Sequence, residues 1–155
     1  MATKSFEIQE EKEATYRKLV SPKLMEELKE KILQRLVIQK KYRDGNYTAR
    51  MMADELQTNV RYVSAVIRVQ FHTNYTTLVN RFRVEEAMSL LTDHRYEELS
   101  VEEIGDIVGF AHRQSFHAAF QKYAGTTPKA FRTQYEQRLP PKPNKKDKNN
   151  KKKKS

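Results

Sequence analysis

Residues 105–128 read GDIVGFAHRQSFHAAFQKYAGTTP and contain side chains suited to recognising another molecule. Phe116, Ala119, Phe120 and Tyr123 recur at helical spacing, which predicts a helix with this face buried. The positions between them carry planar hydrogen-bond donors and acceptors: Arg113, Gln114, His117 and Gln121. Such groups can pair with base edges in the major groove of DNA. A solvated helix face has a similar composition, so the rest of the chain must decide between the two interpretations.

An earlier segment repeats this division into an apolar and a polar face. Val63, Val66 and Ile67 are spaced for burial, and polar side chains lie between them. From the two segments we take five candidates for base contacts: Arg61, Ser64, Arg113, Gln114 and His117. Five other side chains are better suited to phosphates, which position a protein on DNA without specifying sequence: Arg68, Gln121, Lys122, Lys129 and Arg132. The alternative for each is an ordinary exposed helix residue.

The sequence gives little support for catalysis or for a cofactor. Its carboxylate pairs occupy positions that we interpret as solvated or capping: Glu85-Glu86, Glu97-Glu98 and Glu102-Glu103. They are accompanied by no glycine-rich phosphate loop and no Ser/His/Asp set. Cysteine is absent, and no two of the four histidines have the i, i+4 spacing of a shared metal site. We therefore expect no enzyme activity, no cofactor and no metal.

The net charge of +10 describes the C-terminal end more than the rest of the chain. Residues 138–155 hold nine Lys or Arg and one Asp, and therefore eight of the ten net positive charges. Because this stretch has no large apolar side chain to bury beyond its first residues, we expect a disordered tail. Two interpretations of it stay open, a solubilising end and an arm that attracts phosphates whatever their sequence.

Other features bear on where the protein acts. No apolar run reaches the roughly 18 residues that could span a membrane. The N-terminal residues, MATKSFEIQEEKEA, lack the apolar centre of a signal peptide. We therefore expect a cytoplasmic protein that is not bound to a membrane. No heptad seam is long enough to argue for a stable dimer, so we expect a monomer or a weak dimer.

Caps and breakers divide the chain into about seven helices, and the predicted fold class is all-α. The predicted N-caps are Ser21, Thr48, Asn59, Asn74, Ser100 and Thr127. The helix after Ser21 carries a buried stripe at Met25, Leu28, Ile32 and Leu36, and should end near Asp44-Gly45-Asn46. Ser100 and Glu103 form a capping box, and Gly125 should end the helix that includes Phe116. Residues 1–20 are charged and weakly patterned, which favours an arm that is partly helical.

An internal repeat organises these helices. Residues 52–56 (MADEL) correspond to residues 104–108 (IGDIV), so that Ala53 and Gly105 lie 52 positions apart. A small residue at this point lets two helices cross closely, as in a helix-turn-helix. We therefore expect an N-terminal arm (1–20), a first helix-turn-helix subdomain (21–73), a linker helix (74–93), a second helix-turn-helix subdomain (94–137) and the lysine-rich tail (138–155).

These residues resemble the DNA-binding domain of AraC-type transcription regulators over about residues 21–134. The second unit matches the family signature through Ile104-Gly105-Asp106-Ile107-Val108-Gly109-Phe110, Phe116, Phe120, Tyr123, Gly125, Thr127-Pro128 and Phe131-Arg132. The first unit is similar through Met52-Ala53, Leu56, Tyr62-Val63-Ser64, Asn80-Arg81-Phe82-Arg83 and Ala87. The departures are Gln57 and His72, where relatives often have glycine, and Ala65 and Ala118, where many relatives carry a longer side chain that reaches bases.

The resemblance implies a sequence-specific regulator that reads two adjacent major-groove segments of double-stranded DNA. Two non-identical units on one chain need no dimer symmetry, so the site should be asymmetric, with blocks about 10 base pairs apart. We expect no sensory domain of its own, and a structural role for Arg81 between the units. Two alternatives stay open. One is an architectural or non-specific nucleic-acid binder that depends on the basic tail, and the other is an interaction module that faces a protein such as RNA polymerase.

Overall fold

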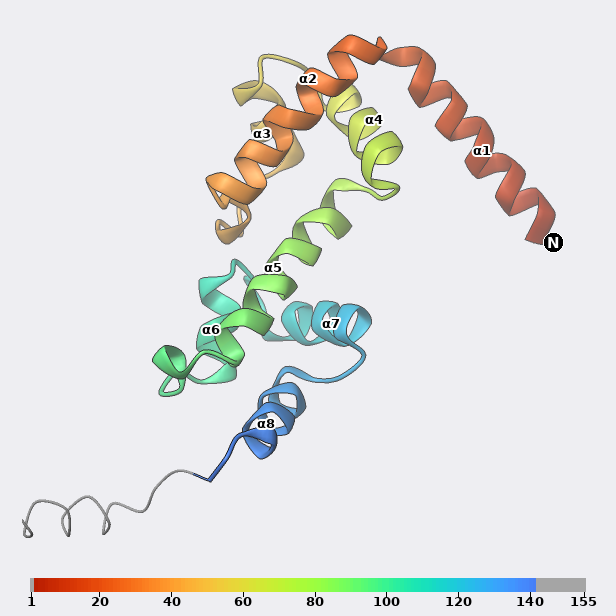
Figure 1. Ribbon diagram of the computed structural model, residues 1–155. Coiled ribbons are helices and arrows are strands. Elements are labelled where there is room, and N and C mark those ends of the chain that lie inside the picture. The colour runs from red at the N-terminus through yellow and green to blue at the C-terminus, as the bar shows by residue number, and fades with distance from the viewer. Residues whose placement is uncertain (1, 142–155) are drawn as a thin grey trace, which may run out of the picture.

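The computed structural model describes residues 2–141, and all regular structure in that range is helical (Figure 1). The predicted all-α fold class is confirmed. The eight α-helices are α1 (Ala2–Leu19), α2 (Pro22–Leu33), α3 (Ala49–Glu55), α4 (Val60–Phe71), α5 (Tyr75–Leu91), α6 (Val101–Ile107), α7 (Arg113–Ala124) and α8 (Pro128–Arg138). Three short turns join them: a π-helical turn Gln34–Ile38 and 3-10 turns Lys41–Arg43 and His94–Tyr96. The proposed tail from residue 142 onward lies outside the described residues.

Side-chain caps begin most of these helices where the sequence predicts them. In five helices the cap oxygen accepts a hydrogen bond from a backbone N–H three residues on: Ser21, Thr48, Asn59, Asn74 and Thr127. In α6 the arrangement is reciprocal. The Glu103 N–H donates to Ser100 Oγ (3.1 Å), and the Ser100 N–H donates to the Glu103 carboxylate (2.7 Å). Each such bond satisfies a backbone donor that a helix start otherwise leaves unpaired.

The helices surround two separate hydrophobic cores, and α5 passes from one to the other (Figure 1). The first core lies among α2, α3, α4 and the N-terminal half of α5, and includes Leu78 and Val79. The second lies among the rest of α5, α6, α7 and α8, and includes Val84, Ala87 and Phe120. The change of core therefore falls between residues 79 and 84 of a single helix.

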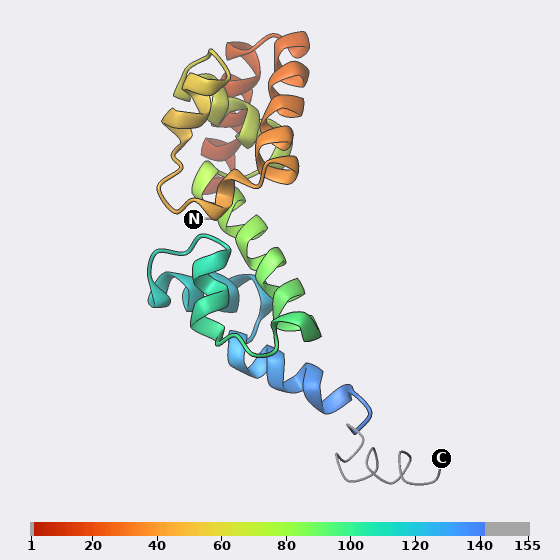
Figure 2. The same cartoon turned by 90° about the vertical axis from the view of Figure 1, so that its left-hand side faces the viewer.

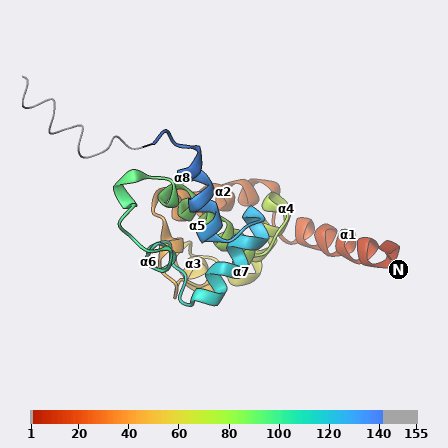
Figure 3. The same ribbon diagram turned by 90° about the horizontal axis from the view of Figure 1, so that it is seen from below.

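The N-terminal segment is a continuous helix and not merely a partly helical arm. α1 packs against α4, with Tyr16 and Leu19 against the first core and Val20 buried at its end. Phe6 and Ile8, in its N-terminal half, are exposed. This half extends away from the body of the molecule in the view from below (Figure 3).

The helix that follows Ser21 ends earlier than the sequence predicts. α2 ends at Leu33, the chain continues as a π-helical turn to Ile38, and Lys40 adopts a left-handed backbone conformation with φ +50°. The predicted stop at residues 44–46 was wrong because a lysine, and not a glycine or asparagine, makes this left-handed turn. As a result, residues 40–45 leave the helix axis and run toward α5.

Candidate nucleic-acid interface

In the first unit, α3 and α4 cross at a small side chain and are joined by a tight turn. Ala53 is buried at the crossing. Gln57 takes a left-handed backbone conformation (φ +57°) in the turn, and Asn59 then caps α4. The C-cap of α4 is His72, which is also left-handed (φ +56°). Both residues stand at positions where the resemblance leads one to expect glycine, and both adopt the glycine-like conformation.

The second unit repeats this geometry with glycines. A Cβ atom on Gly105 would lie 2.6 Å from Phe116 Cδ1, so only glycine allows α6 and α7 to approach this closely. Gly109 (φ +109°) and Gly125 (φ +76°) take the places of Gln57 and His72. The repeat inferred from the sequence is therefore a repeat of backbone conformation as well.

The turns of both units lie on the same side of the molecule. Figure 2 shows the yellow turn after α3 and the teal turn after α6 along one edge, one above the other. Each turn leads into the N-terminal end of the second helix of its unit, α4 or α7. A nucleic-acid duplex lying along this edge would meet both helices.

Most of the predicted base-contacting side chains are available on these two helices. Arg61, Arg113 and Gln114 are exposed, and Ser64 is half-buried. Arg113 forms a long, solvent-exposed ion pair with Glu102 (3.4 Å), which contributes little and would exchange readily for another partner. Base contact by these residues stays a prediction.

His117 differs from the other candidates. Its ring is half-buried and meets Phe116 edge-on, with 5.9 Å between the ring centroids. Its Nε2 atom is buried and has no hydrogen-bond partner within the described residues. A buried polar atom without a partner costs about 1–3 kcal/mol. Of the five candidates, His117 thus has an unused hydrogen-bonding group next to the exposed face of α7.

Among the predicted phosphate ligands, Gln121, Lys122 and Lys129 are exposed and Arg68 is half-buried. Arg132 has a different role. Its guanidinium donates to the carbonyl oxygens of Leu99 (2.6 Å) and Tyr96 (3.4 Å), which ties α8 to the segment before α6. These two bonds give Arg132 a structural role, and a phosphate contact by its other donors stays a prediction.

The structure corrects the role of Ala65. This residue is fully buried, so it cannot be a position at which a longer side chain would reach a base. Four helices pack on α4, namely α1, α2, α3 and α5. More of α4 is consequently buried than the spacing of Val63, Val66 and Ile67 indicates. Ala118, its counterpart on α7, is exposed.

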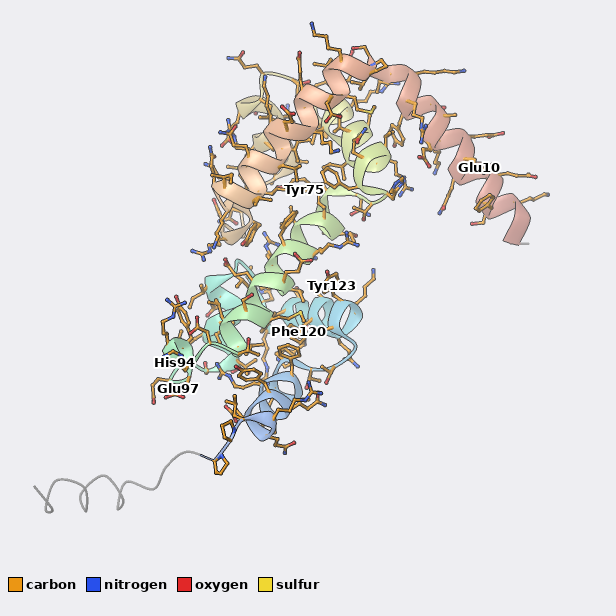
Figure 4. All side chains as sticks on the ribbon, viewed as in Figure 1. Glu10, Tyr75, His94, Glu97, Phe120 and Tyr123 are labelled. Atoms are coloured by element: carbon orange, nitrogen blue, oxygen red, sulfur yellow. The ribbon has the colours of Figure 1, made fainter. Side chains whose placement is uncertain are left out.

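Tyr123 also differs from prediction. Tyr123 was expected in the core but is 44% exposed, because its ring lies beside α5 at the edge of the unit (Figure 4). Its hydroxyl donates to Glu85 (2.6 Å), and the Arg81 guanidinium lies 5.7 Å from its ring centroid. Arg81 thus contacts an aromatic ring of the second unit. The arginine on α5 that binds carbonyls is Arg83.

Two carboxylates have roles that the sequence does not reveal. Glu86, which we interpreted as solvated, has only 9% of its side chain exposed and accepts hydrogen bonds from Lys40, Tyr42 and Arg43. Burial opposes its ionisation, but the bonds from these donors outweigh that effect and hold the pKa of Glu86 below its ordinary value. Glu55 makes a similar cluster inside the first unit. No local signal predicts the Glu86 cluster, because its partners lie more than 40 residues away.

Within residues 2–141, no three His, Asp or Glu side chains are grouped closely enough to hold a metal ion. None of the helices in this range combines the length and apolar character needed to cross a membrane.

The comparisons with known proteins agree with this geometry. Residues 52–134 match the family described as "Helix-turn-helix domain". No functionally curated protein matches the chain. Among solved structures, the C-terminal domain of the two-component response regulator yesN from Fusobacterium nucleatum is 29% identical, with a TM-score of 0.58 over 67% of this chain and 98% of that one.

Two further structures are similar. The C-terminal domain of AraT, a response regulator from Geobacillus stearothermophilus, is 26% identical, with a TM-score of 0.60 over 74% of this chain and 89% of that one. A protein of unknown function from Listeria innocua shares the fold at 20% identity, with a TM-score of 0.56 over 66% of this chain and 95% of that one.

Proposed function

Because the chain belongs to the family of AraC-type helix-turn-helix domains, we propose that it regulates transcription by reading two adjacent major-groove segments of an asymmetric DNA site. The observation that carries this proposal is the common orientation of the two turns along one edge of the molecule. The 17 residues of α5 make it about 26 Å long. This length suits two segments about one helical turn apart, roughly 34–36 Å along the DNA.

The candidate side chains on the two helices divide between the two DNA segments. Arg61 and Ser64 would read the first segment, and Arg113, Gln114 and His117 the second. An arginine can bridge O6 and N7 of guanine, and a glutamine can bridge N6 and N7 of adenine. Arg68, Gln121, Lys122 and Lys129 would hold the flanking phosphates, where charge matters and sequence does not.

The first test is selection from a random duplex library at about 150 mM salt, where non-specific attraction is already much weakened. The protein should be truncated after Arg138, so that the lysine-rich tail cannot dominate binding. We expect an asymmetric consensus with two blocks about 10 base pairs apart, centre to centre. If no sequence is enriched over the starting library, the proposed function is wrong for this part of the chain.

The composition of the tail supports one alternative, an architectural protein that binds nucleic acid without sequence preference. The chain carries eight lysines and one aspartate after Arg138. In this case the full chain would bind all duplexes equally, and the truncated chain would bind none of them measurably at the same salt concentration. A consensus that is the same with and without the tail excludes this alternative.

A further inference from the structure

In addition to their connection through α5, the two units contact each other directly. The contact is made by residues 40–45 of the first unit, by Arg83 and Glu86 on α5, and by Gly109 in the turn of the second unit. We call these residues the interunit joint. In Figure 2 the orange segment that contains residues 40–45 lies immediately above the teal turn of the second unit.

Arg83 contacts both units with one side chain. Its Nε donates to the carbonyl oxygen of Tyr42 (2.8 Å), and its Nη2 lies 3.4 Å from the carbonyl oxygen of Asp44. On its other side the guanidinium lies 5.6 Å from the ring centroid of Phe110, which is in the second core. The guanidinium is half-buried, so these contacts are less exposed to water than an ordinary surface pair.

Glu86 holds residues 40–43 against α5. Its carboxylate accepts bonds from Arg43 Nε (2.6 Å) and Nη2 (2.8 Å), from Lys40 Nζ (2.8 Å) and from the Tyr42 hydroxyl (3.0 Å). The two bonds from Arg43 form a bidentate pair, which fixes orientation as well as distance. Tyr42 is itself buried and stacks on Phe82. The joint thus has a defined geometry and is not a loose surface contact.

Two glycines bring the backbones of the units together. A Cβ atom on Gly45 would lie 2.9 Å from the carbonyl oxygen of Gly109, and one on Gly109 would overlap the carbonyl oxygen of Tyr42. Contacts this close between backbones leave no room for one unit to move toward the other. The joint therefore meets the turn that leads into α7, the second recognition helix.

We infer that the interunit joint fixes the orientation of the two recognition helices, and that Glu86 is a positioning residue that determines the spacing between the two DNA segments. This inference rests on the proposed function, since spacing matters only to a protein that reads two segments. The physical reason is that α5 enters the second core only after Val79, so without the joint a single helix connects the units. A second attachment removes bending and rotation at this point.

The orientation can be measured without DNA. The chain has no cysteine, so Lys31→Cys on α2 and Gln134→Cys on α8 place two spin labels at exposed positions in different units. We expect a narrow distribution of label distances in the otherwise unchanged full chain. Glu86→Ala should make the distribution at least about twofold wider, as for a hinge that has been released.

Glu55→Ala is a matched control. Glu55 also accepts bonds from a tyrosine hydroxyl (Tyr47, 2.9 Å) and an arginine (Arg35, 3.0 Å), and it forms an ion pair with Lys41 of the joint (3.5 Å). None of these partners lies on α5 or in the second unit, so Glu55 does not connect the units. Its loss should lower stability and leave the distance distribution unchanged. If Glu86→Ala and Glu55→Ala give the same distribution as the parent chain, the joint does not fix the orientation and the inference is wrong.

A second variant covers the case in which Glu86→Ala does not fold. Gly45→Ala changes neither core, and its added methyl group would press on the Gly109 carbonyl and separate the units. Circular dichroism should show the same helix content as in the parent chain. The label distances should then shift or broaden, and an unchanged distribution would overturn the inference.

The effect on spacing is measured with duplexes that carry the selected consensus with one base pair added or removed between the blocks. One base pair moves the second block by about 3.4 Å and turns it by about 35°. We expect the parent chain and Glu55→Ala to lose at least about tenfold in affinity, and Glu86→Ala less than about threefold. Equal losses in all three proteins would show that Glu86 does not determine spacing. If no consensus exists, the proposed function fails, and the label distances still decide the role of the joint.

Discussion

At the scale of single residues, the small side chain at each helix crossing sets how closely the two helices of a unit approach. Gly105 is the more demanding case, because a methyl group there would lie 2.6 Å from the Phe116 ring. We expect Gly105→Ala to lower the free energy of unfolding by about 1–3 kcal/mol through overpacking. Urea unfolding followed by circular dichroism measures this loss.

A double-mutant cycle separates this clash from other effects of the substitution. If the Phe116 ring is the obstacle, Gly105→Ala should cost less in a Phe116→Leu background, with a coupling of about 1 kcal/mol. A cost that is the same in both backgrounds would mean that the crossing tolerates a larger side chain, and that glycine is present for another reason.

The proposed base contacts make a prediction for each unit separately. Arg61→Ala should relax sequence preference in the first block only, and Arg113→Ala in the second block only. Each should lose about 1–3 kcal/mol of discrimination, because a bidentate contact to one base pair is removed. Repeating the selection with each variant gives the result, and Arg17→Ala on the projecting helix α1 controls for the loss of one positive charge. Loss of preference in the same block from both variants would contradict the division between units.

Whether a side chain is buried can be predicted from the sequence only where its burial depends on the periodicity of its own helix. Helical spacing correctly predicts that Val63, Val66 and Phe116 are buried. It places Tyr123 wrongly, because the surroundings of this ring come from another helix, α5. The base-reaching position of Ala65 came from the resemblance and not from spacing, and its burial in the first core corrects it. Periodicity predicts that one face of a helix is buried, but it does not predict how many residues beside that face are buried by neighbouring helices.

At the scale of elements, helix starts depend on local chemistry and are therefore the best predicted feature. We expect Ser100→Ala to destabilise the second unit by about 1 kcal/mol, because the backbone N–H of Glu103 loses its acceptor. Ser115→Ala is a matched control, since this exposed serine lies inside α7 and caps no helix. The measurement is thermal unfolding of both variants. Equal stability of the two would show that the capping box contributes nothing measurable.

Helix ends are predicted less well when the residue that makes the turn is not glycine or asparagine. Gly125 marks the end of α7 in both sequence and structure, and Gly109 marks the turn after α6. The left-handed turn at Lys40 has no such signal, so the helix after Ser21 was predicted to be too long. This error matters, because the residues that follow Lys40 form the interunit joint. Contacts between residues 40 positions apart depend on the whole fold and leave no local pattern.

At the scale of the whole molecule, the Glu86 cluster predicts how stability depends on pH. The folded-state pKa of Glu86 lies below its unfolded value of about 4.3. Its contribution to stability is therefore present above that unfolded pKa, and is lost as the pH falls through the lower folded pKa. We expect the free energy of unfolding to fall as the pH drops below about 4.3, and to fall less steeply in Glu86→Gln.

Urea unfolding at a series of pH values gives these slopes. Glu30→Gln on α2 is a suitable control, because this exposed glutamate makes no ion pair with any residue of the described range 2–141. Like Glu86→Gln, this substitution removes one carboxylate, but at a position outside the joint. A slope for Glu86→Gln that matches the parent chain would mean that the cluster does not stabilise the ionised carboxylate.

The tail gives the last prediction, which concerns how binding energy is divided over the whole chain. Truncation after Arg138 removes eight lysines, so affinity should fall for every duplex, and the slope of log K against log salt should decrease by up to about 0.9 for each phosphate that the tail no longer neutralises. The ratio of affinities for specific and random duplexes should stay the same, because the side chains proposed to read bases lie on α4 and α7 and not in the tail. Binding titrations at several salt concentrations measure both quantities. If truncation lowers both the salt slope and the ratio of specific to random affinity, the two helix-turn-helix units do not supply the specificity. The architectural alternative then replaces the regulator.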